Sequence, residues 1–196
     1  MTWQVDKSHT HINFLARHMM IAKVRGEFTD YDVNITFDEN DLTATTVDVT
    51  IKADSVNTRD EKRDAHLMSP DFLNAAEYPV LTFKSKRVIQ DGTNHGRLIG
   101  DLTIRDVTHE VTLDVDYAGA LKTPWGTTSA GFSGKATINR KDWGLNWNVA
   151  LEAGGWLVSD QVTIEIELEL AQVPEVVAEA VAETAVAETA VAEAVA

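Results

Sequence analysis

The chain has 196 residues, 44 % of them hydrophobic, with 17 Lys and Arg against 31 Asp and Glu and a formal net charge of −14. This excess of acidic residues argues against nucleic-acid binding, which depends on cations that contact phosphates. The chain has no cysteine, which excludes disulfides and thiolate chemistry. The longest apolar run, Met19 to Ala22, is far below the roughly 20 residues of a membrane span, and the first residues lack the pattern of a secretory signal. We therefore expect a cytoplasmic globular protein.

Apolar and polar residues alternate with a period of two along most of the chain, which places every second side chain on one face of a strand. Segment 162–170 shows this best, with Val, Ile or Leu at even positions and Thr or Glu at odd ones. The sequence therefore predicts an all-β fold of about eight strands, at 12–18, 33–37, 47–53, 80–88, 98–104, 111–117, 130–138 and 162–170.

The stretch between the third and fourth of these strands has helical signals instead. Thr58 to Glu61 is a capping-box sequence that would start a helix running to about Met68. Ser69 followed by Pro70 resembles an N-cap with proline at the first helical position. We expect two short helices here.

Antiparallel strands with one apolar face can form a two-sheet sandwich or a barrel. The strands are long, and Gly26, Gly100, Gly131 and Gly134 lie within strand patterns, where glycine permits the bends and bulges that a barrel needs. These features favour an eight-stranded antiparallel barrel, which has room for one small ligand. Small residues share the predicted inner face with aromatic ones, which suggests a partly open lumen, although tapered packing gives the same mixture.

The C-terminal segment differs in composition from the rest. From Val173 onward the units Ala180 to Thr184 and Ala185 to Thr189 repeat with a period of five, which forms no continuous apolar stripe on a helix. We expect a barrel domain at 1–172 and a low-complexity tail at 173–196, disordered or transiently helical.

Several histidines have a spacing that could support metal binding. His9 and His11 have a spacing at which two imidazoles can share a metal, with His18 or His109 as a third ligand. His18 has the opposite strand parity, however, and hydrogen-bonded histidines near a barrel rim explain the pattern without a metal. We predict no metal site.

Charged residues also gather from Arg59 to His66, where Arg63, Asp64 and His66 could supply an acid and a base. Such a cluster is more often a solvated helix face with intrahelical ion pairs. The chain has no Gly-x-Ser-x-Gly elbow and no phosphate-binding glycine loop. Five tryptophans suit either core and rim packing or the lining of a cavity: Trp3, Trp125, Trp143, Trp147 and Trp156.

Several short motifs together resemble the YceI-like family of polyisoprenoid-binding, lipocalin-like proteins, over about residues 2–172. They occur in the family's order and spacing: Trp3 to Asp6 with His9, Ile12 to Phe14, Arg17 to Met20, Lys23 to Gly26, Ser55 to Thr58, Arg63 to Leu67, Ser69 to Phe72, Tyr78 to Ser85, Gly100 to Ile104, Val107-Thr108, and Asn139 to Asp142 with Gly144. The chain departs from the family at Leu73 and Trp143, where Phe is common, and at Asp106, where Gly is common.

The resemblance implies an eight-stranded lipocalin-like barrel that binds an isoprenoid quinone, a polyprenyl chain or a fatty chain, for storage, transport or sensing, without catalysis and without a cofactor other than the lipid. Apolar binding of this kind gains roughly 0.8 kcal/mol for each buried CH₂ group. We expect a lumen lined by Phe14, Phe28, Phe72, Phe83, Phe132, Trp143 and Ile164, and a polar mouth formed by Arg17, His18, Arg63, Asp64 and His66.

Two alternatives remain open at the level of sequence. The first is an enzyme for a small hydrophobic substrate that uses Arg63, Asp64 and His66. The second is a stress-related interaction protein with a solid barrel and an acidic tail that meets a basic partner. A homodimer through an exposed edge or a shared barrel face is compatible with each of them.

Overall fold

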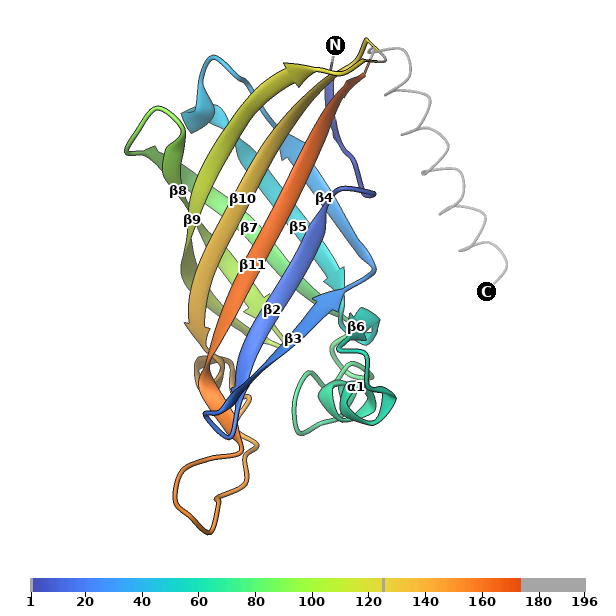
Figure 1. The fold of residues 1–196 in the computed structure, drawn as a ribbon, viewed down its shortest axis with the longest axis vertical. Coiled ribbons are helices and arrows are strands. Elements are labelled where there is room, and N and C mark those ends of the chain that lie inside the picture. Colours follow the sequence, from blue (N-terminus) through green and yellow to red (C-terminus); the bar gives the residue numbers. More distant parts are fainter. Residues whose placement is uncertain (1, 125, 174–196) are drawn as a thin grey trace, which may run out of the picture.

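A computed structural model describes residues 2–124 and 126–173. In this part of the chain, one antiparallel sheet of eleven strands curls into a half-barrel, with a short helix at one end (Figure 1). The strands are β1 (Thr2–Val5), β2 (His11–His18), β3 (Ala22–Phe28), β4 (Tyr31–Thr36), β5 (Thr46–Lys52), β6 (Val56–Asn57), β7 (Val80–Gln90), β8 (His95–Ile104), β9 (Val107–Lys122), β10 (Thr128–Asn139) and β11 (Val158–Val173).

The predicted all-β fold is confirmed, and each of the eight expected strands is present. The expected strand number is wrong, because the sheet also contains β1, β3 and β6. Their patterns are weak: β1 has four residues, β6 has two, and β3 is interrupted by Gly26 and carries Lys23 and Arg25. These strands exist because each lies beside a longer one, β1 on β11 and β3 on β2.

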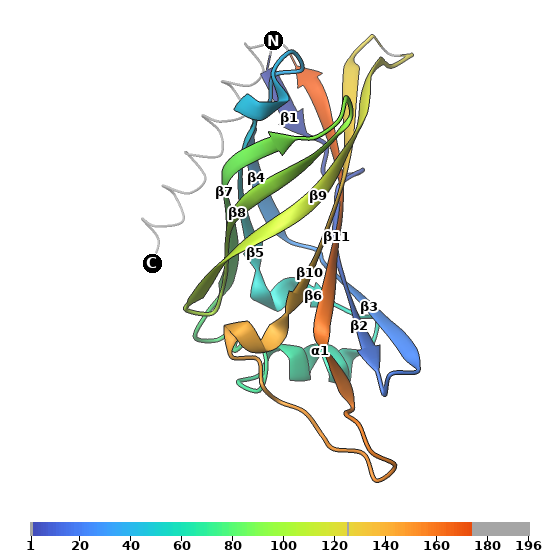
Figure 2. The same cartoon turned by 90° about the vertical axis from the view of Figure 1, so that its left-hand side faces the viewer.

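The expected closed barrel is corrected to a half-barrel. The order β4-β5-β7-β8-β9-β10-β11-β2-β3-β6 leaves β4 and β6 as its two ends, and no ladder in the described residues joins them. β1 continues the line of β2 along β11 and faces β4 (Figure 2). Across this β1–β4 seam the contacts are made by side chains: Lys7 Nζ lies 3.0 Å from Asp32 Oδ1, and the Trp3 and Phe37 rings pack edge to face at 5.3 Å.

One of the two expected helices is confirmed as α1 (Glu61–Met68). Its N-cap is Asp60, whose side chain accepts hydrogen bonds from the backbone N–H groups of Lys62 and Arg63. The second expected helix is wrong. The chain after Ser69 folds back, and backbone N–H groups from Leu73 and beyond donate to carbonyls in the last turn of α1 instead of starting a new helix. Three 3₁₀ turns complete the fold: η1 (Leu42–Ala44), η2 (Ala53–Ser55) and η3 (Arg140–Trp143).

The ladder registers bring the apolar faces of neighbouring strands together. Ile164 lies opposite Ala136 on β10 and opposite Phe14 on β2, so the alternation visible in each segment becomes one continuous apolar surface inside the half-barrel. The β9–β10 register shifts between Gly131 and Phe132, where Ala118 is the extra residue of a bulge on β9 beside Gly119, whose φ is 96°. In the described residues, no helix is long and apolar enough to cross a membrane.

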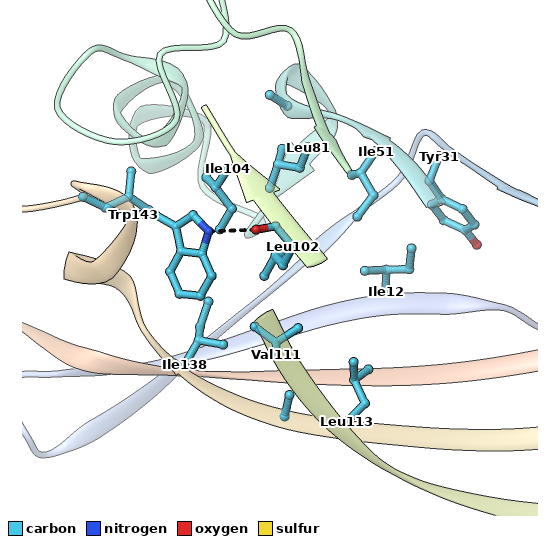
Figure 3. Packing of buried hydrophobic residues seen from close by; sticks show 13 residues of the cluster. Ile12, Tyr31, Ile51, Leu81, Leu102, Ile104, Val111, Leu113, Ile138 and Trp143 are labelled. Atoms are coloured by element: carbon cyan, nitrogen blue, oxygen red, sulfur yellow. Dashed lines mark hydrogen bonds between the residues drawn. The ribbon is translucent and has the colours of Figure 1, made fainter. Parts of the chain in front are cut away.

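The buried side chains form two clusters. The larger occupies the half-barrel near α1 and η3 and is drawn in Figure 3. The smaller lies toward the N-terminus, where the rings of Phe37, Tyr117 and Phe132 are 4.9 to 5.8 Å apart and Trp3 packs on Phe37. We call these four residues the aromatic end cluster.

Candidate functional site

The inner face of the half-barrel surrounds a cavity of about 320 Å³ with an almost entirely apolar wall. This volume falls within the roughly 300 to 1,000 Å³ of small-molecule sites. Val158 and Leu168 of β11 both contribute to the wall, and β11 has two extra residues between Val158 and Val162. The cavity therefore follows that strand for roughly 25 Å at ~3.3 Å per residue. A cavity of this length and volume is narrow, and its shape suits a chain-like molecule better than a compact one.

The cavity extends between the two buried clusters. Leu67 of α1 and the adjacent Phe72 and Leu73 contribute to the wall at the helical end, and Tyr117 and Phe132 of the aromatic end cluster contribute at the other. The half-barrel is therefore hollow, which contradicts the alternative of a solid barrel.

Six of the seven residues expected to line a lumen contribute to this wall: Phe14, Phe28, Phe72, Phe83, Phe132 and Ile164. The seventh, Trp143, does not. It is 2 % exposed and lies in η3, where its indole Nε1 donates to the Leu102 carbonyl at 3.1 Å (Figure 3). Its ring also packs edge to face on His109. Trp143 attaches η3 to β8 behind the wall, because a buried indole N–H needs an acceptor that the apolar cavity does not offer.

The five residues expected at a polar mouth are not among those that line the cavity. Arg17 and His18 lie at the end of β2, where Arg17 is exposed and its backbone N–H donates to Ser159 Oγ at 2.9 Å.

Arg63 and Asp64 are held by Thr58, which is 5 % exposed. Arg63 Nε donates to Thr58 Oγ1 at 2.7 Å, and Asp64 accepts from the Thr58 backbone N–H at 2.9 Å. These bonds attach α1 to the chain after β6. His66 Nε2 lies 2.9 Å from Asp71 Oδ2 instead, and the His66 ring packs on the rings of Phe72 and Trp147. The three residues of the enzyme alternative therefore do not converge on the cavity.

The polar groups at the cavity wall are ones that the sequence interpretation missed. At the β7–β8 hairpin they are Gln90, Asn94, His95 and Arg97. His95 Nδ1 lies 2.8 Å from Asp116 Oδ1, and this hydrogen bond is the main reason that the pKa of His95 is raised above its ordinary value. The turn residues of 91–94 mark the hairpin, but which of its side chains face the cavity follows from the curl of the sheet.

At the helical end, Arg140 of η3 contributes to the wall and is 3 % exposed. Its Nε donates to the Ser159 carbonyl at 3.0 Å, and its Nη2 lies 3.7 Å from Asp160 Oδ1. Burial lowers the pKa of this guanidinium below its ordinary value, and Asp160 partly opposes that shift. In the sequence, Arg140 belongs to one of the family motifs, and nothing in the pattern of that motif indicates that its side chain is buried.

The histidines expected to be hydrogen-bonded have such partners in two cases. His109 Nε2 lies 3.0 Å from the Asp142 carbonyl, and His9 Nδ1 lies 3.0 Å from Asp6 Oδ2. Hydrogen bonds to the carboxylate from Ser8 and then from His9 lower the pKa of Asp6 to about 2. With Glu169, Asp6 and His9 place three possible ligand atoms within 4.8 Å of one another, the one such group in the described part of the chain.

A curled antiparallel sheet around a narrow apolar cavity defines the class of all-β half-barrels that have room for a ligand. Comparison with known proteins gives the family. The model of the YceI-like domain matches residues 3–170, and a UPF0312 protein of Staphylococcus epidermidis is 38 % identical over 167 residues, 85 % of this chain and 95 % of the relative. The chain belongs to the YceI-like family, as the motifs predicted.

Solved structures share this fold. The YceI protein of Campylobacter jejuni is 34 % identical, with a TM-score of 0.70 over 81 % of this chain and 90 % of that one. A domain from Saccharophagus degradans, described as a polyisoprenoid binding domain implicated in plant cell wall breakdown, has a TM-score of 0.60 at 14 % identity over 89 % of this chain and 99 % of that one. At that identity the likeness concerns the fold alone.

Proposed function

We propose that this protein binds a long hydrophobic molecule in the half-barrel, without catalysis: an isoprenoid quinone, a polyprenyl chain or a fatty chain that is stored, transported or sensed. One observation carries the proposal, namely the narrow apolar cavity that extends along β11 from Val158 to Leu168. Membership of the YceI-like family supports a hydrophobic ligand, as does the fold shared with a domain named for polyisoprenoid binding.

The physical basis is the removal of apolar surface from water. Each CH₂ group that enters the cavity gains about 0.8 kcal/mol, or roughly fourfold in affinity. Since the wall offers few polar groups, affinity depends mainly on how much chain is buried. The polar residues at the β7–β8 hairpin and Arg140 at the helical end are the groups at which a headgroup could be placed without losing its hydrogen bonds.

A series of linear alcohols of increasing length tests this basis. Displacement of a fluorescent fatty-acid probe should show affinity rising by roughly fourfold per carbon and then reaching a plateau when the cavity is full. A steady rise without a plateau would indicate micelle-like adsorption, and no displacement at any length would contradict the proposal. Native mass spectrometry of protein from its own host then identifies which class of chain copurifies.

A matched pair of variants on one strand locates the binding. Ile166 lines the cavity, whereas its neighbour Glu167 lies on the other face of β11 and is exposed. Ile166→Asn should weaken binding by roughly tenfold to a hundredfold, because it places an amide without partners against the bound chain. Glu167→Gln should leave affinity unchanged, and circular dichroism checks that both variants fold. Equal affinities in the two variants would place the ligand elsewhere.

One further variant tests the alternative that the protein is an enzyme. Replacing His66 by Ala should leave ligand retention intact, because His66 is not among the residues that line the cavity. Loss of a measurable turnover in this variant, with retention unchanged, would favour catalysis over binding.

A further inference from the structure

The turn between β2 and β3 presents three large apolar side chains to solvent. Met19, Met20 and Ile21 are 39 %, 60 % and 81 % exposed. Met19 and Met20 have backbone φ angles of 51° and 59°, a left-handed conformation that glycine, Asn and Asp normally occupy in tight turns. Neither solubility nor turn geometry accounts for apolar side chains at these positions.

The loop between η3 and β11 adds two more exposed apolar residues beside this turn. Val149 is 45 % exposed and Trp156 is 51 % exposed. The two segments are connected, because the Met19 N–H donates to the Leu157 carbonyl at 2.8 Å and the Leu157 N–H donates to the Val149 carbonyl at 2.9 Å. Figures 1 and 2 show both segments projecting from the end of the half-barrel where α1 and η3 lie.

These five residues, Met19, Met20, Ile21, Val149 and Trp156, form what we call the apolar tip. They are five of the seven large hydrophobic residues that are exposed in the described part of the chain. The other two are Val80 and Leu121, and Leu121 lies near the β9–β10 hairpin, at the opposite end of the half-barrel. Exposed apolar surface is therefore concentrated at one end of the molecule, which is typical of an interaction site.

Two cations lie directly behind the tip. Arg17 and Lys23 are both exposed and are opposite each other in the β2–β3 ladder, an arrangement that disfavours the pair because like charges face each other. Segment 11–26 contains no acid, although the whole chain carries −14. Arg25 lies 3.7 Å from Glu165 on the neighbouring strand.

The nearby loop is close to neutral. Lys141 Nζ lies 2.9 Å from Asp160 Oδ2 and 6.0 Å from the centre of the Trp156 ring. Glu152, in the turn between Val149 and Trp156, is the acid closest to the tip along this loop. The charge balance at this end of the half-barrel thus differs from the acidic character of the chain as a whole.

We propose that the apolar tip docks on the surface of an anionic lipid bilayer. Met19, Met20, Ile21 and Trp156 enter the headgroup region, where aromatic and aliphatic side chains are favoured, and Arg17 and Lys23 contact lipid phosphates. Repulsion between the bilayer and the acidic remainder of the protein holds the half-barrel on its end. Docking goes beyond the binding of a ligand and does not depend on which ligand the cavity holds.

Single-cysteine variants test the proposal, since the natural chain has no cysteine. Ile21→Cys and Leu121→Cys are each labelled with an environment-sensitive fluorophore and mixed with vesicles of phosphatidylcholine and phosphatidylglycerol. The label at position 21 should shift to the blue and brighten, and the label at position 121 should not change. Vesicles of phosphatidylcholine alone, or high salt, should reduce the effect. No shift at position 21, or equal shifts at both positions, would overturn the proposal.

Vesicle sedimentation of unlabelled variants measures how much the apolar residues and the two cations each contribute to vesicle binding. Ile21→Ser combined with Trp156→Ser should reduce the partition onto anionic vesicles by about tenfold or more. Arg17→Gln combined with Lys23→Gln should reduce it on anionic vesicles only, and Leu121→Ser should change nothing. Alcohol uptake in solution, measured on the same proteins, should be unaffected, which separates failure of docking from failure of cavity binding.

Light scattering without lipid tests whether a second copy of the chain, instead of a bilayer, binds the apolar tip. A doubled mass that falls to the monomer value in Ile21→Ser, together with no vesicle binding, would make the tip an interface between two copies and would overturn docking on a membrane. A mass that is the same in both proteins, together with the vesicle effects above, supports docking.

Discussion

Individual residues shape the cavity wall through close contacts that a side chain's chemical type does not reveal. Gly26 of β3 is the clearest case, because a Cβ at this position would lie 2.3 Å from the Phe14 ring and 2.8 Å from Thr58 Cγ2. The missing side chain lets the Phe14 ring lie across β3 and contribute to the wall. Gly134 of β10 is different, since the nearest atoms to a Cβ there are 3.7 Å away.

We therefore expect opposite effects from the same substitution at these two glycines. Gly26→Ala should lower the free energy of unfolding by about 1 to 3 kcal/mol, because it displaces Phe14 in a packed region. Gly134→Ala should leave it unchanged or raise it by up to ~1 kcal/mol, because alanine restricts the unfolded chain. Urea unfolding measures both values, and equal destabilisation would show that the Phe14 contact is not the cause.

A residue-level prediction also concerns pH. The hydrogen bond to Asp116 raises the pKa of His95, with smaller contributions from Asp91 and Asp114. A pKa raised in the folded state means that this group stabilises the protein below the ordinary histidine pKa and that the contribution is lost as pH rises through the raised value.

An NMR titration should place the His95 midpoint above that of an unstructured histidine. Asp116→Asn should bring the midpoint back toward the ordinary value, whereas Asp48→Asn, on β5, should not move it. A midpoint that is indifferent to Asp116 would contradict the assignment of the main cause.

Among the elements, β4 determines where the half-barrel stays open. It pairs with β5 on one side, and no backbone hydrogen bond in the described residues joins its other side to β1. The Lys52 N–H donates to the Asp30 carbonyl at 3.0 Å. By the alternation of an antiparallel ladder, Asp32 and Asn34 then point their amides toward β5, and Val33 and Ile35 point theirs toward the seam.

Hydrogen exchange should resolve this alternation. The amides of Val33 and Ile35 should exchange faster than those of Asp32 and Asn34, because their backbone has no ladder partner. The amides of Ser133 and Gly134 should both exchange slowly, because β10 has a paired strand on each side. Uniform protection along β4 would mean that the β1–β4 seam is closed by hydrogen bonds in solution.

The molecule as a whole consists of a sheet that ends at Val173, followed by the repetitive segment. Residues 174–196 lie outside the described residues, so the predicted tail remains a prediction. The pairing of β1 with β11 extends to Thr2 and Val173, and the cavity wall is formed by residues up to Leu168. The last residues of β11 are therefore needed to hold β1, while the wall itself ends before them.

Two truncations separate these contributions. A chain that ends at Val173 should keep the melting temperature and the alcohol affinity of the full protein. A chain that ends at Glu169 loses every ladder partner of β1, so it should melt at a lower temperature and expose Trp3, as measured by calorimetry and fluorescence. Loss of uptake in the Val173 chain would assign a binding role to the repetitive segment.

The eight main strands and their apolar faces follow from local pattern, as do the wall residues Phe14, Phe83, Phe132 and Ile164, because a period of two assigns each side chain to a face wherever the strand lies in the fold. Phe28 and Phe72 lie outside the predicted strands and are expected at the wall from the family resemblance alone. Strand neighbours depend on contacts between distant segments instead. Pairing with β2 makes a strand of the basic segment 22–28, and the curl of the sheet leaves β1 and β4 without a ladder. Hydrogen-bond partners that are remote in sequence likewise determine that Trp143 binds the Leu102 carbonyl behind the wall and that Arg140 is buried at it.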